Sequence, residues 1–139
     1  MESILLDTNV LSELVRPRPD PEWFADRTGD LFYVTAITRA EILLGIALLP
    51  AGRRRDSLAA AADEMFAQDF AGRCLPFDAA TAARYAEVVA GRRSAGHAAT
   101  TEDAQIAAIA LTHRYPLATR NTKDFLHMKG LALYDPWQQ

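Results

Sequence analysis

The sequence predicts an α/β protein, a three-layer α/β/α fold with a mostly parallel central sheet. Short apolar or β-branched segments alternate with stretches of helical periodicity, and the connections between them are short. No repeat, low-complexity tract or linker interrupts the 139 residues, so we expect a single domain spanning 1–139. A chain of this length can bury a core without disulfides or structural metals.

The chain begins with an apolar strand. Ile4–Leu6 is followed at once by a polar turn, which places the carboxylate of Asp7 at the end of a buried strand. Asn9 is expected to cap a short helix over residues 10–15, and Pro17 would end that helix because proline cannot continue it.

The next elements are a helix, a strand and a longer helix. Asp20 is a capping residue followed by proline in the first turn, which predicts a helix from Pro21 to about Arg27. Leu31–Thr35 is rich in aromatic and β-branched residues and predicts the second strand. It leads into a helical stretch from Thr38 to Leu49, which Pro50 ends.

The middle of the chain predicts two longer helices with a brief strand between them. Residues 53–70 carry an apolar stripe at helical spacing, which indicates a core or subunit contact. A third strand is expected at Cys74–Phe77, before Asp78 caps a helix that runs to about Ser94. The stripe consists of Leu58, Ala62, Met65, Phe66 and Phe70.

The last third predicts a helix at about Glu102–His113, with a buried apolar side. A fourth strand is expected at Pro116–Thr119, a short helical turn at Asn121–His127, and a last strand at Leu131–Tyr134. Right-handed crossovers in a parallel sheet bring every strand-to-helix junction to the same edge.

Four acids occupy these junctions: Asp7 after the first strand, Glu41 after the second, Asp103 in the first turn of a helix, and Asp124 after the fourth strand. We therefore expect all four to face one pocket. Each acid considered alone also has a local explanation, since an acid in a first helical turn caps the helix and favours its dipole.

Two of these local explanations are specific. Thr38-x-x-Glu41 fits a capping box, and Thr100-x-x-Asp103 nearly does. Four converging carboxylates would nevertheless raise one another's pKa unless a cation neutralised them. Oxygen ligands without a Cys or His cluster point to Mg²⁺ or Mn²⁺ rather than zinc. Such a site supports attack of an activated water on a phosphodiester.

Several segments, in this order and spacing, resemble a PIN domain, and in particular the VapC toxins of bacterial type II toxin–antitoxin pairs in the FitB-like group. The resemblance covers nearly the whole chain, including the closing residues 134–137. The segments are Ile4–Glu13, Thr35-x-x-Thr38-x-x-Glu41-x-x-x-Gly45, Glu102–Ala108 and Ala118–Phe125.

The resemblance implies a Mg²⁺-dependent ribonuclease. Asp7, Glu41, Asp103 and Asp124 would be the acidic site, and Asp7 and Asp103 the principal metal ligands. Either Glu102 or Asp103 could point inward. In the family, polar residues surround the acids, and the matching residues here are Thr8, Asn9, Ser12, Thr119 and Asn121.

The same resemblance implies partners. A cognate VapB-like antitoxin would wrap the chain and inhibit it, and operator DNA would be bound only through that antitoxin. We expect a homodimer, and a higher hetero-oligomer with the antitoxin.

The charge balance restricts how RNA can be bound. A net charge of -3 and a pI near 5.6 argue against binding through overall positive charge, so contact must use a local basic patch. Arg39 and Arg120 are the best candidates for the RNA backbone because they lie close to the predicted site in sequence. Arg53–Arg55 and Arg92–Arg93 have the usual pattern of solvated helix ends, with contact to the RNA backbone as the alternative.

The lone Cys74 cannot form an internal disulfide, and the N-terminus lacks the features of a secretion signal. Apolar runs stay well short of the roughly 18 residues of a membrane span. We expect a cytoplasmic protein without a membrane partner.

Other functions remain open. An aspartyl phosphatase would need a second acid where Asn9 stands and an activating lysine, for which Lys123 is the sole candidate. A non-catalytic module could capture an arginine of a partner in the acidic pocket. A PIN nuclease of RNA maturation would act without an antitoxin.

Overall fold

The protein is described by a computed structural model covering residues 1–12 and 18–137. Its centre is a five-stranded sheet in the order β3-β2-β1-β4-β5, and every paired strand is parallel, as predicted. The strands are β1 (Ser3–Leu6), β2 (Leu31–Thr35), β3 (Cys74–Leu75), β4 (Leu117–Ala118) and β5 (Leu133–Tyr134).

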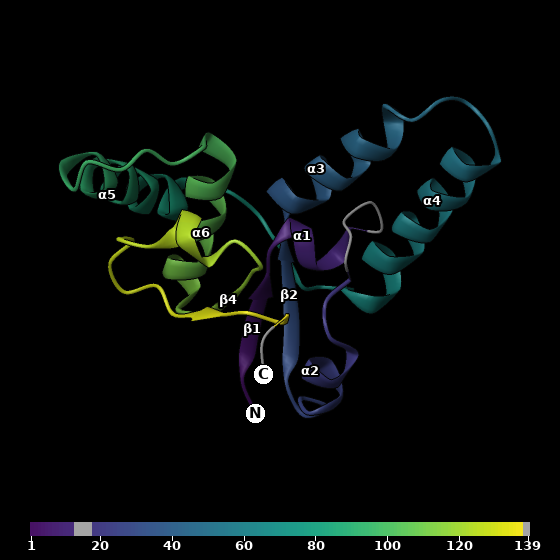
Figure 1. The fold of residues 1–139 in the computed structure, drawn as a ribbon, viewed down its shortest axis with the longest axis horizontal. Coiled ribbons are helices and arrows are strands. Elements are labelled where there is room, and N and C mark those ends of the chain that lie inside the picture. The colour runs from purple at the N-terminus through teal and green to yellow at the C-terminus, as the bar shows by residue number, and fades with distance from the viewer. Residues whose placement is uncertain (13–17, 138–139) are drawn as a thin grey trace.

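Helices connect these strands and form the outer layers. In Figure 1, α5 and α6 lie to the left of the sheet, α2 and α4 lie to its right, and α3 continues from the upper end of β2. The helices are α1 (Thr8–Leu11), α2 (Pro21–Ala25), α3 (Ala36–Ala47), α4 (Arg53–Glu64), the π-helical turn η1 (Met65–Asp69), α5 (Ala79–Ser94), α6 (Thr101–His113) and the 3₁₀ turn η2 (Thr122–Phe125).

The central strand β1 is buried on both faces. Successive side chains of a strand point to opposite sides, so Ile4 and Leu6 enter one core while Leu5 enters the other. The three side chains are at most 2% exposed. Asp7 follows directly, so this buried strand ends in a carboxylate.

The two cores are built from different helices. The first packs α2, α3, α4 and η1 against the sheet, with Trp23 among aromatic rings and Phe66 from the predicted stripe. The second packs α5 and α6, whose Ile106 and Ile109 are fully buried. This arrangement confirms the three-layer prediction.

The first helix differs from its prediction. It begins at Thr8 and is capped by Asp7, whose side chain accepts a hydrogen bond from the backbone N–H of Thr8. Asn9 therefore lies inside the helix instead of capping it. Ser12 is extended, which ends α1 at Leu11, and the rest of the predicted segment 10–15 lies outside the described residues.

Two further boundaries shift for local reasons. The side chain of Thr35 caps α3 by accepting from the N–H of Thr38, so this helix starts at Ala36, two residues earlier than expected. The predicted helix 53–70 is helical from Arg53 to Asp69, but its last turn widens to the π-helical turn η1. The α5 helix starts after Asp78, as predicted.

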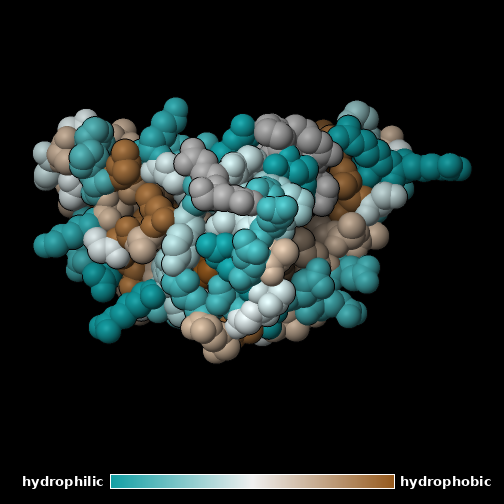
Figure 2. Space-filling view, turned by 60° about the horizontal axis from the view of Figure 1, so that its bottom comes forward, coloured by the Kyte–Doolittle hydropathy of each residue, from teal (hydrophilic) through white to brown (hydrophobic). Residues whose placement is uncertain are grey.

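Figure 2 shows a face of the molecule that is largely hydrophilic, with hydrophobic surface in separate patches toward its two sides. Within the described residues, no helix combines the length and apolar character that crossing a membrane requires.

Candidate functional site

The four predicted acids are carried by four different segments. Asp7 caps α1 directly after β1, and Glu41 lies in the second turn of α3. Asp103 lies in the first turn of α6, and Asp124 lies in η2, a few residues after β4. Three of them influence one another through their charges, because Asp7, Glu41 and Asp103 each have a pKa raised by another of the four acids.

Asp7 is the most enclosed of the acids, with 4% of its surface exposed. One carboxylate oxygen accepts from the N–H of Thr8 at 2.8 Å, and the other accepts from the hydroxyl of Thr119 at 2.8 Å. Burial raises the pKa of Asp7 to about 6, because these two hydrogen bonds only partly offset the loss of water. The charges of Asp103 and Glu41 contribute smaller parts of the same shift.

Glu41 does not form the expected capping box with Thr38. Its Oε1 accepts from the hydroxyl of Thr8 at 2.8 Å, which ties α3 to the start of α1. Thr8 and Thr38 hydroxyl oxygens are 3.0 Å apart, and since Thr8 gives its proton to Glu41, Thr38 must donate to Thr8. Burial, then the charges of Asp103 and Glu102, raise the pKa of Glu41.

Asp103 sits where Thr100 caps α6, because the Thr100 hydroxyl oxygen accepts from the N–H of Asp103 at 3.1 Å. Burial raises the pKa of Asp103, and the charges of Asp124 and Glu102 add to the effect. Glu102 is exposed while Asp103 is half-buried, so Asp103 is the more enclosed of the two adjacent acids.

The supporting polar residues lie mostly around Asp7. The Asn9 amide lies 3.4 Å from both Asp7 Oδ2 and Thr119 Oγ1, and its oxygen accepts from the N–H of Arg120 at 3.2 Å. The N–H of Asn121 donates to the Thr119 hydroxyl at 3.1 Å. Together these contacts join the end of β1 to the end of β4.

Ser12 and the two candidate arginines lie at the end of α1, on α3 and directly after Thr119, respectively. Ser12 ends α1 and lines an apolar pocket. Arg39 is exposed on α3, with its guanidinium 5.1 Å from the ring centre of Phe66. Arg120 is exposed beside Asn9, with its guanidinium 5.5 Å from the ring of Trp137.

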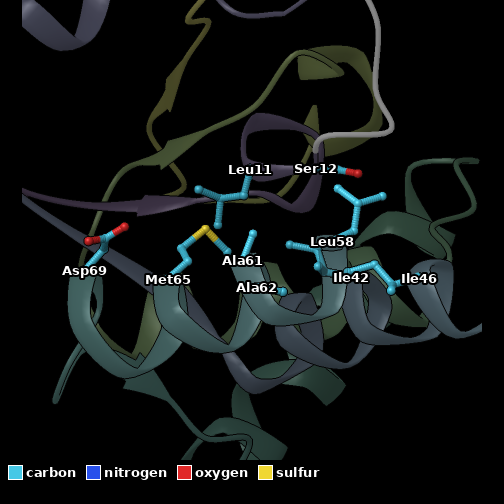
Figure 3. Close-up of a pocket in the computed structure, with 9 residues that line it drawn as sticks. All are labelled: Leu11, Ser12, Ile42, Ile46, Leu58, Ala61, Ala62, Met65 and Asp69. Carbon is cyan, nitrogen blue, oxygen red and sulfur yellow. The ribbon is translucent and has the colours of Figure 1, made fainter. Parts of the chain in front are cut away.

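The apolar pocket lies between α1, α3 and α4, where side chains of the three helices point toward one another (Figure 3). Leu58 and Met65 belong to the predicted stripe, which thus lines a groove as well as a core. The remaining lining residues are Leu11, Ser12, Ile42, Ile46, Ala61, Ala62 and Asp69.

Sequence reasoning missed two residues here. Thr38 was read as a cap, and its buried hydroxyl instead supports Thr8. Arg92 was read as a solvated helix end, yet it is 5% exposed. The signal was available in the helix periodicity, because Arg92 falls on the same side of α5 as Thr81 and Val88, both of which are buried.

The donor set fits a hard cation such as Mg²⁺, since the converging side chains offer carboxylate and hydroxyl oxygens. Among the described residues, no three acidic, histidine or cysteine side chains already stand close enough together to hold a metal ion. Mg²⁺ usually keeps several waters and takes one or two protein carboxylates, so it does not require such a cluster.

The PIN domain family matches residues 4–131. The chain is 43% identical to the plasmid stability protein StbB of Pseudomonas syringae pv. tomato, over 97% of this chain and 99% of that protein. It is 39% identical to toxin FitB of Neisseria gonorrhoeae, over 96% and 98% of the two chains.

A third relative, the VapC ribonuclease Y4jK of Sinorhizobium fredii, is 37% identical over 97% of this chain and 98% of that protein. Among solved structures, a chain of FitAB bound to an IR36 DNA fragment superposes with a TM-score of 0.85 at 38% identity. That match covers 98% of this chain and 96% of the other.

Proposed function

The chain belongs to the PIN-domain family, and from this premise we propose that it is the toxic component of a toxin–antitoxin pair and cleaves RNA. The observation that supports the proposal is that Asp7, Glu41 and Asp103, on three separate segments, each have a pKa raised by the charge of another of the four predicted acids. Carboxylates held close together repel one another, and a bound cation would relieve this repulsion. A cation beside a phosphodiester is the basis of metal-assisted hydrolysis.

Asp7 and Asp103 are the proposed principal ligands of Mg²⁺, for which Mn²⁺ could substitute. Bound there, the ion would supply an activated water and neutralise charge on the phosphate. The chain itself holds Asp7 with three donors, Thr8, Asn9 and Thr119, so its oxygens keep one orientation.

Glu41 and Asp124 complete the catalytic set. Thr8 fixes one oxygen of Glu41 and leaves the other able to accept a proton from the attacking water. The raised pKa of Glu41 suits this role, because a base works best when its pKa lies closer to the working pH. Asp124 adds negative charge on the α6 side of the site.

RNA is the proposed substrate despite the net charge of -3. Phosphate neutralisation then falls to local arginines, and Arg120 is the better placed of the two candidates because its backbone is hydrogen-bonded to Asn9 beside Asp7. Arg39 is exposed and lies two residues before Glu41 in sequence. It would contact the RNA strand on the α3 side of the site.

A VapB-like antitoxin is the proposed protein partner, because toxin FitB is a relative at 39% identity and a chain of FitAB superposes on this chain at a TM-score of 0.85. We assign its inhibitory segment to the apolar groove between α1, α3 and α4 (Figure 3). Operator DNA would be contacted through the antitoxin, since this chain is acidic.

The proposed homodimer would use the outer side of α3. Leu44 and Leu48, one helical turn apart, are 60% and 76% exposed. Exposed apolar side chains on neighbouring turns favour contact with a second copy.

The test is cleavage of single-stranded and structured RNA by the purified, partner-free protein, with Mg²⁺ and with excess chelator. Asp103→Asn is the inactive variant, and Asp63→Asn, an exposed acid on α4, is the matched control. We expect cleavage by the wild type and the control with Mg²⁺, and none with chelator or in Asp103→Asn.

Equal traces of cleavage in all four samples would identify a contaminant and favour a binding module that captures a partner's arginine. Coexpression with the product of an adjacent small reading frame should suppress cleavage. Cleavage that no neighbouring product suppresses would favour an RNA-maturation nuclease.

A further inference from the structure

We infer that Arg92 is a positioning residue, whose guanidinium holds together the two segments that carry Asp103 and Asp124. The inference rests on the proposed function, in which these two acids belong to the metal site. Arg92 is not hydrogen-bonded to either acid. It acts through the backbone of the two segments that carry them.

The guanidinium of Arg92 spans two segments that are far apart in sequence. It emerges from the last turn of α5, donates from Nη2 to the carbonyl of Ala98 at 2.7 Å, and donates from Nη1 to the carbonyl of Leu126. Ala98 lies two residues before the cap of α6, and Leu126 directly follows η2. One side chain therefore fixes the approach to Asp103 and the exit from Asp124.

Other contacts show that these segments lie side by side. The rings of His97 and His127 stack with centres 4.2 Å apart and planes 11° from parallel. The N–H of His97 donates to the carbonyl of Arg92 at 2.8 Å. Arg92 is thus enclosed between the two segments, which explains why only 5% of it is exposed.

The charge of Arg92 has no direct carboxylate partner among the described residues. Its Nε also lacks a hydrogen-bond partner in that part of the chain. A guanidinium stays ionised in proteins, and burying an unpaired charge is costly, so a purely structural filler at this position would be apolar. The two hydrogen bonds to carbonyls of different segments give the charged fork a role that an apolar side chain could not fill.

The geometry requires arginine. A planar fork can donate in two directions to carbonyls of different segments, whereas a lysine ammonium is a single point on a flexible stem. Arg92→Lys keeps the charge but cannot bind both carbonyls at once. Arg92→Met loses the charge and both hydrogen bonds while keeping much of the buried aliphatic stem. Arg93→Met is the matched control, because Arg93 is the adjacent residue and is exposed.

The experiment has two readouts on metal-free protein at a temperature where circular dichroism shows every variant folded. Amide hydrogen exchange is followed in peptides covering residues 97–100 and 124–128, and Mn²⁺ binding is measured by titration of the free ion. In both Arg92 variants we expect faster exchange in the two peptides and Mn²⁺ affinity weakened about tenfold, with Arg93→Met like the wild type.

Unchanged Mn²⁺ affinity in Arg92→Lys would overturn the inference, even if its melting temperature fell, because a merely structural role predicts that result. If Arg92→Met does not fold, Arg92→Lys decides. A wild type that binds no Mn²⁺ would overturn the metal proposal alone, and the exchange of the two peptides would still decide whether Arg92 holds them.

Discussion

The two sides of the acidic site are constructed differently. Asp7 and Glu41 lie at the ends of central strands or on the helix that follows, and each carboxylate accepts side-chain hydrogen bonds from threonines. Asp103 and Asp124 lie in a helix start and a 3₁₀ turn, and the segments that carry them are joined through the carbonyls bound by Arg92.

This difference shows that the fold positions its acidic side chains in two different ways. On the Asp7 side, fixed donors stabilise the carboxylates in position, and burial accounts for most of the raised pKa. On the Asp103 side, a positive charge set back from the acids offsets part of their repulsion. The first side is ordered by the sheet, and the second depends on a contact made from outside it.

The largest effect should come from removing the charge on the ordered side. Asp7→Asn keeps the side chain's shape, so we expect cleavage to fall by about a thousandfold, corresponding to several kcal/mol of lost metal-assisted stabilisation. RNA cleavage at saturating Mg²⁺ measures it, with Asp26→Asn, an exposed acid, as control. A fall of less than tenfold would place the metal wholly on the Asp103 side.

The same substitution should stabilise the metal-free protein. The pKa of Asp7 is about 6 in the folded chain and 3.8 in a model peptide, so the folded state binds more protons between these values. Stability therefore falls as pH rises from about 4 to about 6, and stays lower above that. Asp7→Asn removes this loss, a gain of up to about 3 kcal/mol at pH 7.

Thermal unfolding in chelator from pH 4.5 to 8 checks this. The wild-type midpoint should fall between pH 4.5 and about 6 and then level off, while that of Asp7→Asn changes less. A wild-type midpoint that rises with pH between 4.5 and 6 would contradict the raised pKa.

A smaller effect should follow from removing one fixed donor. Thr119→Val preserves shape and deletes the hydroxyl that donates to Asp7, which should cost about 1–3 kcal/mol at pH 7 because a buried carboxylate loses a partner. Urea unfolding measures it. Thr112→Val, which deletes a hydroxyl bonded within α6, is the control and should cost less. Equal costs would mean that the hydrogen bonds around Asp7 add nothing specific.

The smallest effect should be that of Glu102→Gln. Glu102 is exposed, and its charge reaches Glu41 and Asp103 through solvent, so we expect cleavage to change by less than about fivefold. Parallel assays of Glu102→Gln and Asp103→Asn decide which acid serves the site. A loss as large as that of Asp103→Asn would show that both acids are required.

The sequence predicted the part of this arrangement that depends on burial and periodicity. An apolar strand before Asp7 placed its carboxylate at the sheet edge, and the same reasoning gave the parallel sheet. Glu41 was ambiguous, because a threonine three residues earlier fits a cap as well as a support. The distinction depends on Thr8, which tertiary structure brings from another segment.

The partners of Arg92 could not be predicted from the sequence. Helix periodicity places it on the buried side of α5 with Thr81 and Val88, but only the tertiary structure brings the carbonyls of Ala98 and Leu126 to its guanidinium. The widened turn η1 had no signal in the sequence, since its residues continue the periodicity of α4. These features arise from contacts between elements, which a single sequence leaves unspecified.

The alternation of Ile4, Leu5 and Leu6 between two cores has a consequence for how this protein can change in length. A one-residue insertion within β1 would exchange the two faces and displace Asp7 by the same step, so folding and chemistry would fail together. An insertion near Gly96, in the exposed loop after α5, would leave both faces of β1 unchanged and would displace the segment that Arg92 binds at Ala98. A change in length should therefore abolish folding on one side of the site and weaken only the placement of Asp103 and Asp124 on the other.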